Sequence, residues 1–417
     1  MAGCAAVEIV FYLWLCLLGH QVFTTFVSSA DTFEYDRVAR ELAAGHLVAT
    51  KRTLAYPLFL SLGYRAAGEN AIYWIVAVQL VLNLSLTALC WKLVEKLAPQ
   101  AGTSLRVFLT LFCFLAGMGM ALYLLSDFLA SLCFGAFLYG FLFWRSRRTL
   151  VLSALALALA TLIRPTFTLI PLLLPALAFL VKHCTSRLPL VHLLVFIVTS
   201  LAATGLSIAY QYAYQGYVGP SPIVTQNIQR VLYFATADGK MPFRDHLKAF
   251  ESEIGGRAGR SYDGLSRTEQ EKYAKQIFWE QLMVHPKEIA SLSLRTFLNY
   301  IFVPVESTIA RITDFLERGD SYQRYIRPTL GLACLPIWIL SLVPPVGSRS
   351  KWSYYLIVLI LVLYMAGITA LNPRQGERIR FPILAFMLPI VAWNGQACLR
   401  YLRKWRQKGN NLTEACM

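Results

Sequence analysis

Long apolar segments recur along almost the whole of this 417-residue chain and are separated by short polar stretches. A helix needs about 20 apolar residues to cross a bilayer, where every backbone amide must be satisfied within its own segment. Segments of this kind lie at about 6–27, 71–91, 106–125, 128–144, 149–163, 166–181, 189–211, 329–346, 352–371 and 381–398. The pattern therefore predicts an all-α, polytopic membrane protein with about ten transmembrane helices.

The segments 149–163 and 166–181 are short, and only Arg164 and Pro165 separate them. Because proline removes a backbone donor and breaks helices, the two segments could instead form one broken helix. The predicted number of spans therefore has a margin of about two.

A polar island at 28–41 directly follows the first predicted span. Three acidic residues, Asp31, Glu34 and Asp36, lie close together in it. Apolar residues recur there at helical spacing, and a glycine suits the end of that helix; they are Tyr35, Val38, Ala39, Leu42 and Gly45. Acids gathered at a membrane surface in a chain this apolar mark the place where we expect chemistry.

The composition agrees with a membrane protein. Charged residues make up 15% of the chain and hydrophobic residues 57%, with a mean hydropathy of +0.52, whereas a soluble domain carries roughly a quarter charged residues. The net charge of +16 comes from basic residues in short loops and in the tail at 399–417, as contact with anionic lipid headgroups requires. This distribution argues against nucleic-acid binding.

The same basic residues predict the orientation, because Lys and Arg in short loops mark the cytoplasmic side. They lie at Lys92, Lys96, Arg106, Arg145, Arg147, Arg148, Lys182, Arg187, Arg349, Lys351, Arg400, Arg403, Lys404, Arg406 and Lys408. With ten spans, both termini lie in the cytoplasm and the loop 28–70 lies outside the cell (inner) membrane. Ser28-x-Ala30 could pass for a signal-peptide cleavage site, but the preceding apolar run is long and lacks an early Lys or Arg, so we expect the first span to be retained.

The longest polar region, 212–328, separates the N-terminal membrane module, 1–211, from the C-terminal membrane helices, 329–398. It contains none of the nine cysteines, and no cysteine spacing suggests a disulfide framework or zinc site. Ser266 and Glu269 form a capping box that predicts a helix over 266–284. We expect mainly helical structure on the membrane face, with four apolar side chains of that helix turned inward: Phe278, Trp279, Leu282 and Met283.

Three further polar sites are predicted on the same side of the membrane as Asp31. They are Ser126-Asp127, Arg164-Pro165 and the arginine-rich loop 372–382. If these loops converge, carboxylates and guanidinium groups face each other, which suits transfer of a group from a phosphate. Arginines would stabilise the leaving phosphate, and Asp31 would take a proton from the incoming hydroxyl. Glu34 or Asp127 would orient this base or help to bind a divalent cation; no other cofactor is expected.

Several short motifs along the chain resemble those of one known enzyme superfamily. They are Asp31-x-x-x-Tyr35-x-x-x-Ala39 with Gly45, Tyr56-Pro57-Leu58-Phe59-Leu60, Ser126-Asp127, Leu162-Ile163-Arg164-Pro165 and Gly376-Glu377-Arg378-x-Arg380-Phe381-Pro382. In this order they resemble the GT-C superfamily of membrane glycosyltransferases, in the bacterial branch related to protein O-mannosyltransferases and the lipid A aminoarabinose transferase. The region 212–328 resembles no family that we can name.

The resemblance implies a polyprenyl-phosphate sugar donor and an essential acid in the first external loop, which corresponds to Asp31. Many members have Asp-Glu at this point, whereas this chain has Thr32 after the aspartate, so the need for a metal is open. The resemblance also implies donor-phosphate binding by Arg378 or Arg380, and less directly by Arg52 and Arg164. Other expected substrate contacts are Tyr35, Lys51, Tyr56 and Glu377. The acceptor would be an envelope glycan, lipid or protein.

Each candidate also has a structural interpretation. Asp31 could simply cap a helix, as could Asp127, and Arg164-Pro165 could mark a helix end. Glu34 and Asp36 could be solvated or paired with Arg37 and Arg40. Within the spans, His20 and Asn83 are expected to pack or to form hydrogen bonds between helices.

Two other functions compete with glycosyl transfer. A flippase or transporter of lipid-linked glycans is favoured less, because the charges gather at the outer surface and the chain has no paired repeats. An O-antigen-type polymerase or ligase would use the long outer loop, which contains His246 and His285. The chain has no Asp-x-Asp motif and no cytoplasmic domain large enough to bind a nucleotide sugar.

Overall fold

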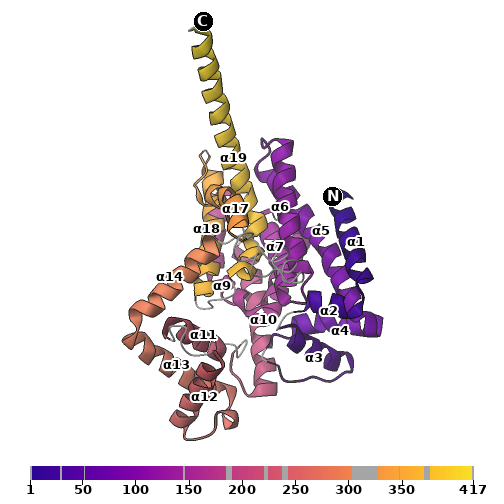
Figure 1. Ribbon diagram of the computed structural model, residues 1–417, viewed down its shortest axis with the longest axis vertical. Coiled ribbons are helices and arrows are strands. Elements are labelled where there is room, and N and C mark those ends of the chain that lie inside the picture. The colour runs from indigo at the N-terminus through magenta and orange to yellow at the C-terminus, as the bar shows by residue number, and fades with distance from the viewer. Residues whose placement is uncertain are drawn as a thin grey trace.

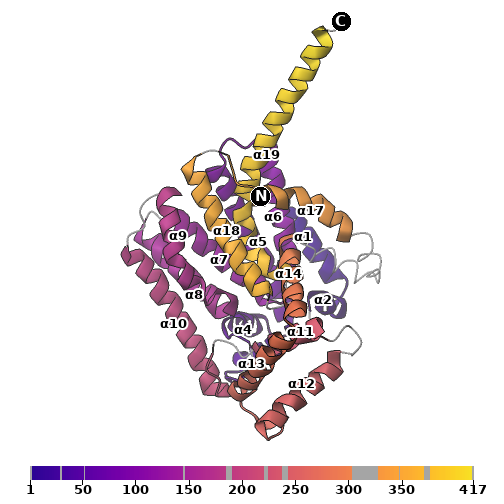
Figure 2. The ribbon, with the colours of Figure 1, turned by 90° about the vertical axis from the view of Figure 1, so that its left-hand side faces the viewer.

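A computed structural model describes residues 2–28, 31–50, 52–143, 146–184, 190–219, 224–236, 243–302, 327–346, 348–370 and 376–415. Helices are the only regular elements in these ranges. The long ones form an upright bundle whose two chain ends lie at the same end, whereas α3, α12 and α13 lie at the opposite end (Figures 1 and 2).

Ten of the described helices form the bundle, and shorter helices and helices α11 to α14 lie around it or at its end. The bundle contains α1 (Ala2–Leu17), α5 (Ala71–Leu97), α6 (Thr103–Ala121), α7 (Ser126–Phe143), α8 (Arg147–Ile163), α9 (Ile170–Cys184), α10 (Leu190–Gln215), α17 (Arg327–Leu342), α18 (Arg349–Ala370) and α19 (Gly376–Ala415). The remaining helices are α2 (His20–Val27), α3 (Thr32–Ala43), α4 (Ala55–Ala67), η1 (Gly68–Asn70), η2 (Pro165–Phe167), α11 (Val224–Thr236), α12 (Phe243–Ala258), η3 (Tyr262–Gly264), α13 (Arg267–Val284) and α14 (Pro286–Phe302).

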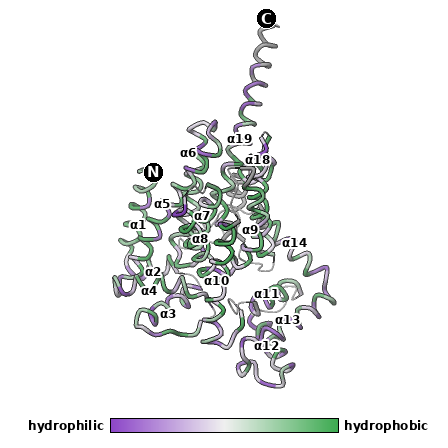
Figure 3. The backbone as a smooth tube through the Cα atoms, turned by 180° about the vertical axis from the view of Figure 1, so that it is seen from behind, coloured by the Kyte–Doolittle hydropathy of each residue, from purple (hydrophilic) through white to green (hydrophobic). Residues whose placement is uncertain are grey.

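Six helical segments within the described ranges are long and apolar enough to cross a membrane. They are Ala55–Leu97, Thr103–Ala121, Ser126–Phe143, Val191–Gln215, Arg349–Ile368 and Pro382–Trp405. Hydrophobic residues dominate the bundle in Figure 3, and several large apolar side chains face outward from it, among them Leu152, Leu172 and Val198. The fold is therefore that of a helical membrane protein, but the prediction of ten spans is not confirmed.

The first predicted span, 6–27, is not one continuous helix. Helix α1 ends at Leu17, and α2 begins at His20 after Gly19, whose φ of 89° is readily adopted only by glycine. The break was missed because hydropathy continues unchanged through it. His20 Nδ1 lies 3.2 Å from the hydroxyl of Tyr73, as expected of a packing residue.

The chain also breaks at Arg164, so 149–163 and 166–181 belong to two helices. Helix α8 ends at Ile163, Arg164 is extended with φ −146° and ψ 122°, and Pro165 opens the short helix η2 before α9. A residue that precedes proline is driven out of the helical region by contact with the proline ring, which accounts for the break.

Aromatic packing fills the bundle core, where Phe134, Phe137, Phe141 and Phe196 are buried together.

Buried hydrogen bonds connect three helices of the bundle, α1, α5 and α6. The side-chain amide of Asn83 donates to Glu8 Oε1 over 2.7 Å and to the carbonyl of Phe114 over 3.2 Å. The prediction that Asn83 joins helices is therefore confirmed.

Helices α11 to α14 enclose a second, smaller core. Its buried residues are Val231, Leu232, Phe250, Ile254, Leu265, Ala274, Ile277 and Ile289. The predicted capping box is present at the start of α13, with Ser266 and Glu269 bonded reciprocally. The predicted inward face is only half right, because Phe278 and Leu282 pack against this core while Trp279 and Met283 are exposed.

The final helix extends well past the bundle, since α19 continues through most of the basic tail to Ala415 (Figure 1). Six cysteines are described with free thiols, namely Cys4, Cys16, Cys90, Cys113, Cys133 and Cys398.

Candidate functional site

Helix α3 carries the predicted acids and packs as its spacing predicts. Its apolar positions, Tyr35, Val38, Ala39 and Leu42, are buried, and Gly45 beyond its end has a φ of 90°. Asp31 occupies the N-cap position, but its side chain forms no capping hydrogen bond. Its carboxylate instead forms an ion pair with Arg52, so capping does not account for this residue.

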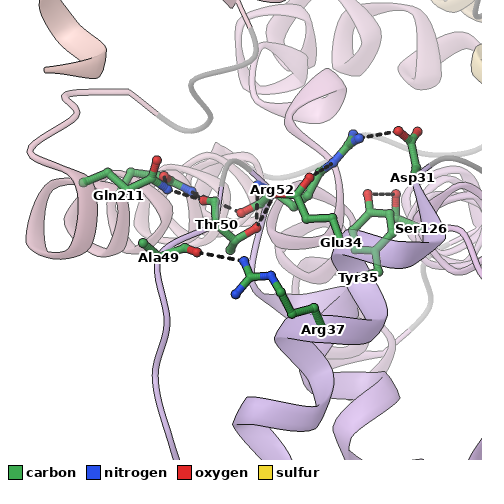
Figure 4. A network of polar contacts seen from close by, with 10 residues as sticks. Asp31, Glu34, Tyr35, Arg37, Ala49, Thr50, Arg52, Ser126 and Gln211 are labelled. Atoms are coloured by element: carbon green, nitrogen blue, oxygen red, sulfur yellow. Dashed lines mark hydrogen bonds and ion pairs between the residues drawn. The ribbon is translucent and has the colours of Figure 1, made fainter. Parts of the chain in front are cut away.

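Arg52 bridges both acids at the start of α3 (Figure 4). Its Nη2 pairs with Asp31 Oδ1, and its Nε donates to Glu34 Oε2 over 3.2 Å. The hydroxyl of Thr50 donates to the other oxygen of Glu34 over 3.1 Å. The side chains of Asp31, Arg52 and Glu34 are 22%, 13% and 20% exposed, respectively. We call these three side chains the Arg52 cluster, which is sheltered but not closed to solvent.

The Arg52 guanidinium is held in its charged form. Burial lowers the pKa of Arg52, but its electrostatic attraction to Tyr35, Asp31 and Glu34 outweighs burial and raises that pKa above its ordinary value. The guanidinium also lies 5.4 Å from the centre of the Tyr35 ring, where a cation is attracted to the aromatic face.

The segment that carries Arg52 is fastened to helix α10. Gln211 Nε2 donates to the carbonyls of Thr50 and Arg52 over 3.3 and 3.1 Å, and Gln215 donates to the same Thr50 carbonyl. On the other side, the hydroxyl of Thr53 donates to the carbonyl of Ile163 over 2.6 Å. The position of Arg52 is thus fixed by two distant helices.

A second ion pair lies next to this cluster and is closed to solvent. Asp127 at the start of α7 pairs with Arg164 at the end of α8, and their side chains are only 1% and 9% exposed. Tyr35 lies on the helix that carries Glu34, and Ser126 directly precedes Asp127. A hydrogen bond of 3.0 Å between their hydroxyl groups joins the segments that carry the two ion-paired groups. The predicted convergence of the first loop, Ser126-Asp127 and Arg164 is therefore observed.

The other predicted site residues are placed as follows. Glu34 pairs with Arg52 and not with Arg37, whereas Asp36 pairs with Arg40 over 2.9 Å, one helical turn away. Tyr56 is completely buried, packs edge-on against Tyr35 with ring centres 5.0 Å apart, and donates to Gln79 over 3.1 Å. Tyr56 therefore helps to fix the position of the Tyr35 ring by packing against it.

Four predicted residues cannot be placed in the site. Lys51 lies outside the described residues. Glu377, Arg378 and Arg380 belong to the first turns of α19, but their side chains lie outside what the structure describes. The predicted approach of the loop 372–382 to the Arg52 cluster thus stays a prediction.

The residues that the structure describes do not group into a divalent-cation site. Within the described ranges, no three side chains of His, Cys, Asp or Glu are grouped to hold a metal ion. Asp31 and Glu34 face the same guanidinium, so a cation between them would meet its positive charge.

Thr50, Gln211 and Gln215 were missed by the sequence interpretation. The two glutamines had a weak signal, because they lie four residues apart at the polar end of an otherwise apolar helix.

No family model matches this chain, and no curated protein or solved structure matches it significantly. The resemblance to GT-C enzymes therefore remains a prediction.

Proposed function

We propose that this protein is a GT-C-type glycosyltransferase that moves a sugar from a polyprenyl-phosphate donor to an envelope glycan, lipid or protein on the extracytoplasmic face of the membrane. The observation that carries this proposal is the meeting of the Arg52 cluster with the Asp127–Arg164 pair at one end of a membrane bundle. The partly exposed carboxylates and guanidinium of the Arg52 cluster would supply a base for the acceptor and positive charge for the donor phosphate, while the closed pair would hold the helices beside them.

In the proposed reaction, Asp31 accepts the proton of an acceptor hydroxyl, whose oxygen forms a bond to the anomeric carbon of the sugar. The bond from that carbon to the phosphate oxygen breaks, and its electron pair leaves with the phosphate. A single displacement of this kind inverts the anomeric centre. Glu34, held by Arg52 and Thr50, keeps the guanidinium directed at the site.

Arg52 has the capacity to bind the donor phosphate while it holds both acids. A guanidinium has five N–H donors, and only Nη2 and Nε of Arg52 take part in its hydrogen bonds to carboxylates. Its Nη1 group forms no hydrogen bond within the described part of the chain. Charge-assisted hydrogen bonds from this group would stabilise the departing phosphate.

The proposal is tested by measuring sugar transfer from a polyprenyl-phosphate donor in membranes. Asp31→Asn removes the base and should abolish most of the transfer. Asp36→Asn is the matched control, because Asp36 lies on the same helix but pairs with Arg40. Arg378→Ala should weaken donor use. If both aspartate variants transfer equally well at equal expression, Asp31 is not the base; unchanged donor dependence would remove Arg378 from the phosphate site.

One observation favours a transporter of lipid-linked glycans as a second candidate. Glu8 is buried in the bundle against Asn83, and α1 and α2 are interrupted at Gly19. Intramembrane ionisable groups and broken helices are typical of transport pathways. Transporter activity would move the intact donor across a vesicle membrane without cleaving its sugar-phosphate bond, so analysis of the lipid product separates the two functions.

A further inference from the structure

The corner between α13 and α14 exposes large apolar side chains on both of its helices. Trp279, Met283 and Val284 are 61%, 82% and 68% exposed near the end of α13. Leu294 and Leu298 are exposed on α14. The opposite face of α13, with Ala274 and Ile277, already fills the small core. An apolar face of this extent on one pair of helices indicates a surface that meets something other than water.

Both helices repeat one pattern of charge and apolar residues. On α13, Lys272 precedes Trp279 by seven residues and Met283 by eleven. On α14, Lys287 precedes Leu294 and Leu298 by the same two intervals. Residues at these spacings share one face of a helix, so each face carries a lysine about two turns from its apolar pair. Neither lysine forms an ion pair with another described residue.

The position of this corner indicates what covers it. Helix α14 leaves the small core and packs against α18 and α19. The exposed Leu294 and Leu298 therefore lie on the helix that connects the small core to the candidate membrane spans. In Figures 1 and 2 the corner lies at the level of the second half of α10, a candidate membrane span, while α12 lies beyond it. Figure 1 also shows the corner projecting sideways from the bundle, toward the region that lipid would occupy.

We propose that the α13–α14 corner rests on the bilayer surface, with Trp279, Met283 and Leu294 among the lipid headgroups and Lys272 and Lys287 at anionic phosphates. Tryptophan suits this depth because its ring is apolar while its N–H can still reach a polar partner. Lysine extends its charge to the headgroups along an apolar stem. This contact fixes the height of the small helical domain above the membrane, and it does not depend on the proposed chemistry.

The contact is tested with a fluorescent probe on full-length protein in nanodiscs of phosphatidylcholine and phosphatidylglycerol. Met283→Cys carries the probe at the corner, and Glu253→Cys carries it on α12 as the matched exposed control. Unsubstituted protein, labelled in parallel, supplies the blank for the native cysteines. We expect spin-labelled lipid to quench the probe at 283 several-fold more than the probe at 253, and aqueous iodide to do the reverse.

Two results would overturn the proposal. Equal access of iodide to both probes would place the corner in water. Protection of position 283 from both quenchers would show that protein, such as a second copy of this chain, covers it.

The role of the lysines is tested in the same nanodiscs. Lys272→Glu combined with Lys287→Glu should reduce lipid quenching at 283 when phosphatidylglycerol is present and change it little in phosphatidylcholine alone. Lys248→Glu on α12 is the control for a general change in charge. Undiminished quenching in the anionic nanodiscs would overturn the assignment of the lysines.

Discussion

The Asp127–Arg164 pair and the Arg52 cluster are built from the same chemical groups, yet their surroundings differ. Solvent hardly reaches the pair, whereas the carboxylates of the cluster are about one-fifth exposed. The pair joins the start of α7 to the end of α8, and the cluster lies on a loop segment and the first turn of α3. The closed pair is therefore expected to hold helices together, whereas the open cluster has carboxylates that solvent can reach.

The largest expected effect on folding comes from breaking the closed pair. Asp127→Ala leaves Arg164 buried without this carboxylate, which should cost about 3–5 kcal/mol of folding free energy. Unfolding of the protein in nanodiscs measures this loss. Asp127→Leu combined with Arg164→Leu should recover part of it, because no uncompensated charge then remains. A stability within about 1 kcal/mol of the wild type in the single variant would contradict the assignment.

A smaller and more local effect is expected in the open cluster. Arg52→Gln removes the ion pairs to Asp31 and Glu34, but water can reach the carboxylates that remain, so the total loss should be about 1.5–3 kcal/mol. Hydrogen exchange should become faster in 31–54 and stay unchanged in α7 and α8. Arg37→Gln is the control, since Arg37 lies on the same helix and, among the described residues, its side chain donates one hydrogen bond, to the carbonyl of Ala49 over 3.4 Å. Faster exchange throughout the bundle would mean that the cluster is structural.

The smallest effect is expected at the exposed side chain of Glu269 at the start of α13. Hydrogen bonds from the backbone and hydroxyl of Ser266, together with Arg260, hold the pKa of Glu269 below its ordinary value of 4.5. The folded state therefore binds this proton less readily than the unfolded state. The contribution of Glu269 is complete above pH 4.5 and is lost as the pH falls through the lower, folded pKa.

Hydrogen exchange of α13, corrected for intrinsic rates, measures this loss between about pH 6 and about pH 3.5. Glu269→Gln should remove this part of the pH dependence. An identical pH profile in the variant would show that another group is responsible.

Local signals in the sequence predicted local structure well. The spacing of apolar residues placed helix α3, and Ser266 with Glu269 placed the start of α13, because both depend on neighbours within a few residues. The sequence also predicted that Asp31, Asp127 and Arg164 would gather at one end of the bundle. Membrane topology accounts for this success, since it brings alternate loops to the same side.

Contacts across long stretches of chain could not be predicted in the same way. Gln211 reaches the carbonyl of Arg52 across 159 positions, and only the packing of α10 beside the first loop selects that partner. The break at Gly19 depends on a backbone angle that hydropathy does not report. The outward direction of Trp279 likewise depends on where the small core lies, not on helical spacing.

The most direct test of the account compares Asp31→Asn with Asp127→Asn in one purified preparation, measuring both the folded fraction and sugar transfer per folded molecule. We expect Asp31→Asn to fold normally and to transfer sugar about 10²–10⁴-fold more slowly, because general bases usually contribute this much to a rate. We expect Asp127→Asn to yield less folded protein, which retains most of its transfer rate. Wild-type transfer by well-folded Asp31→Asn would contradict the account.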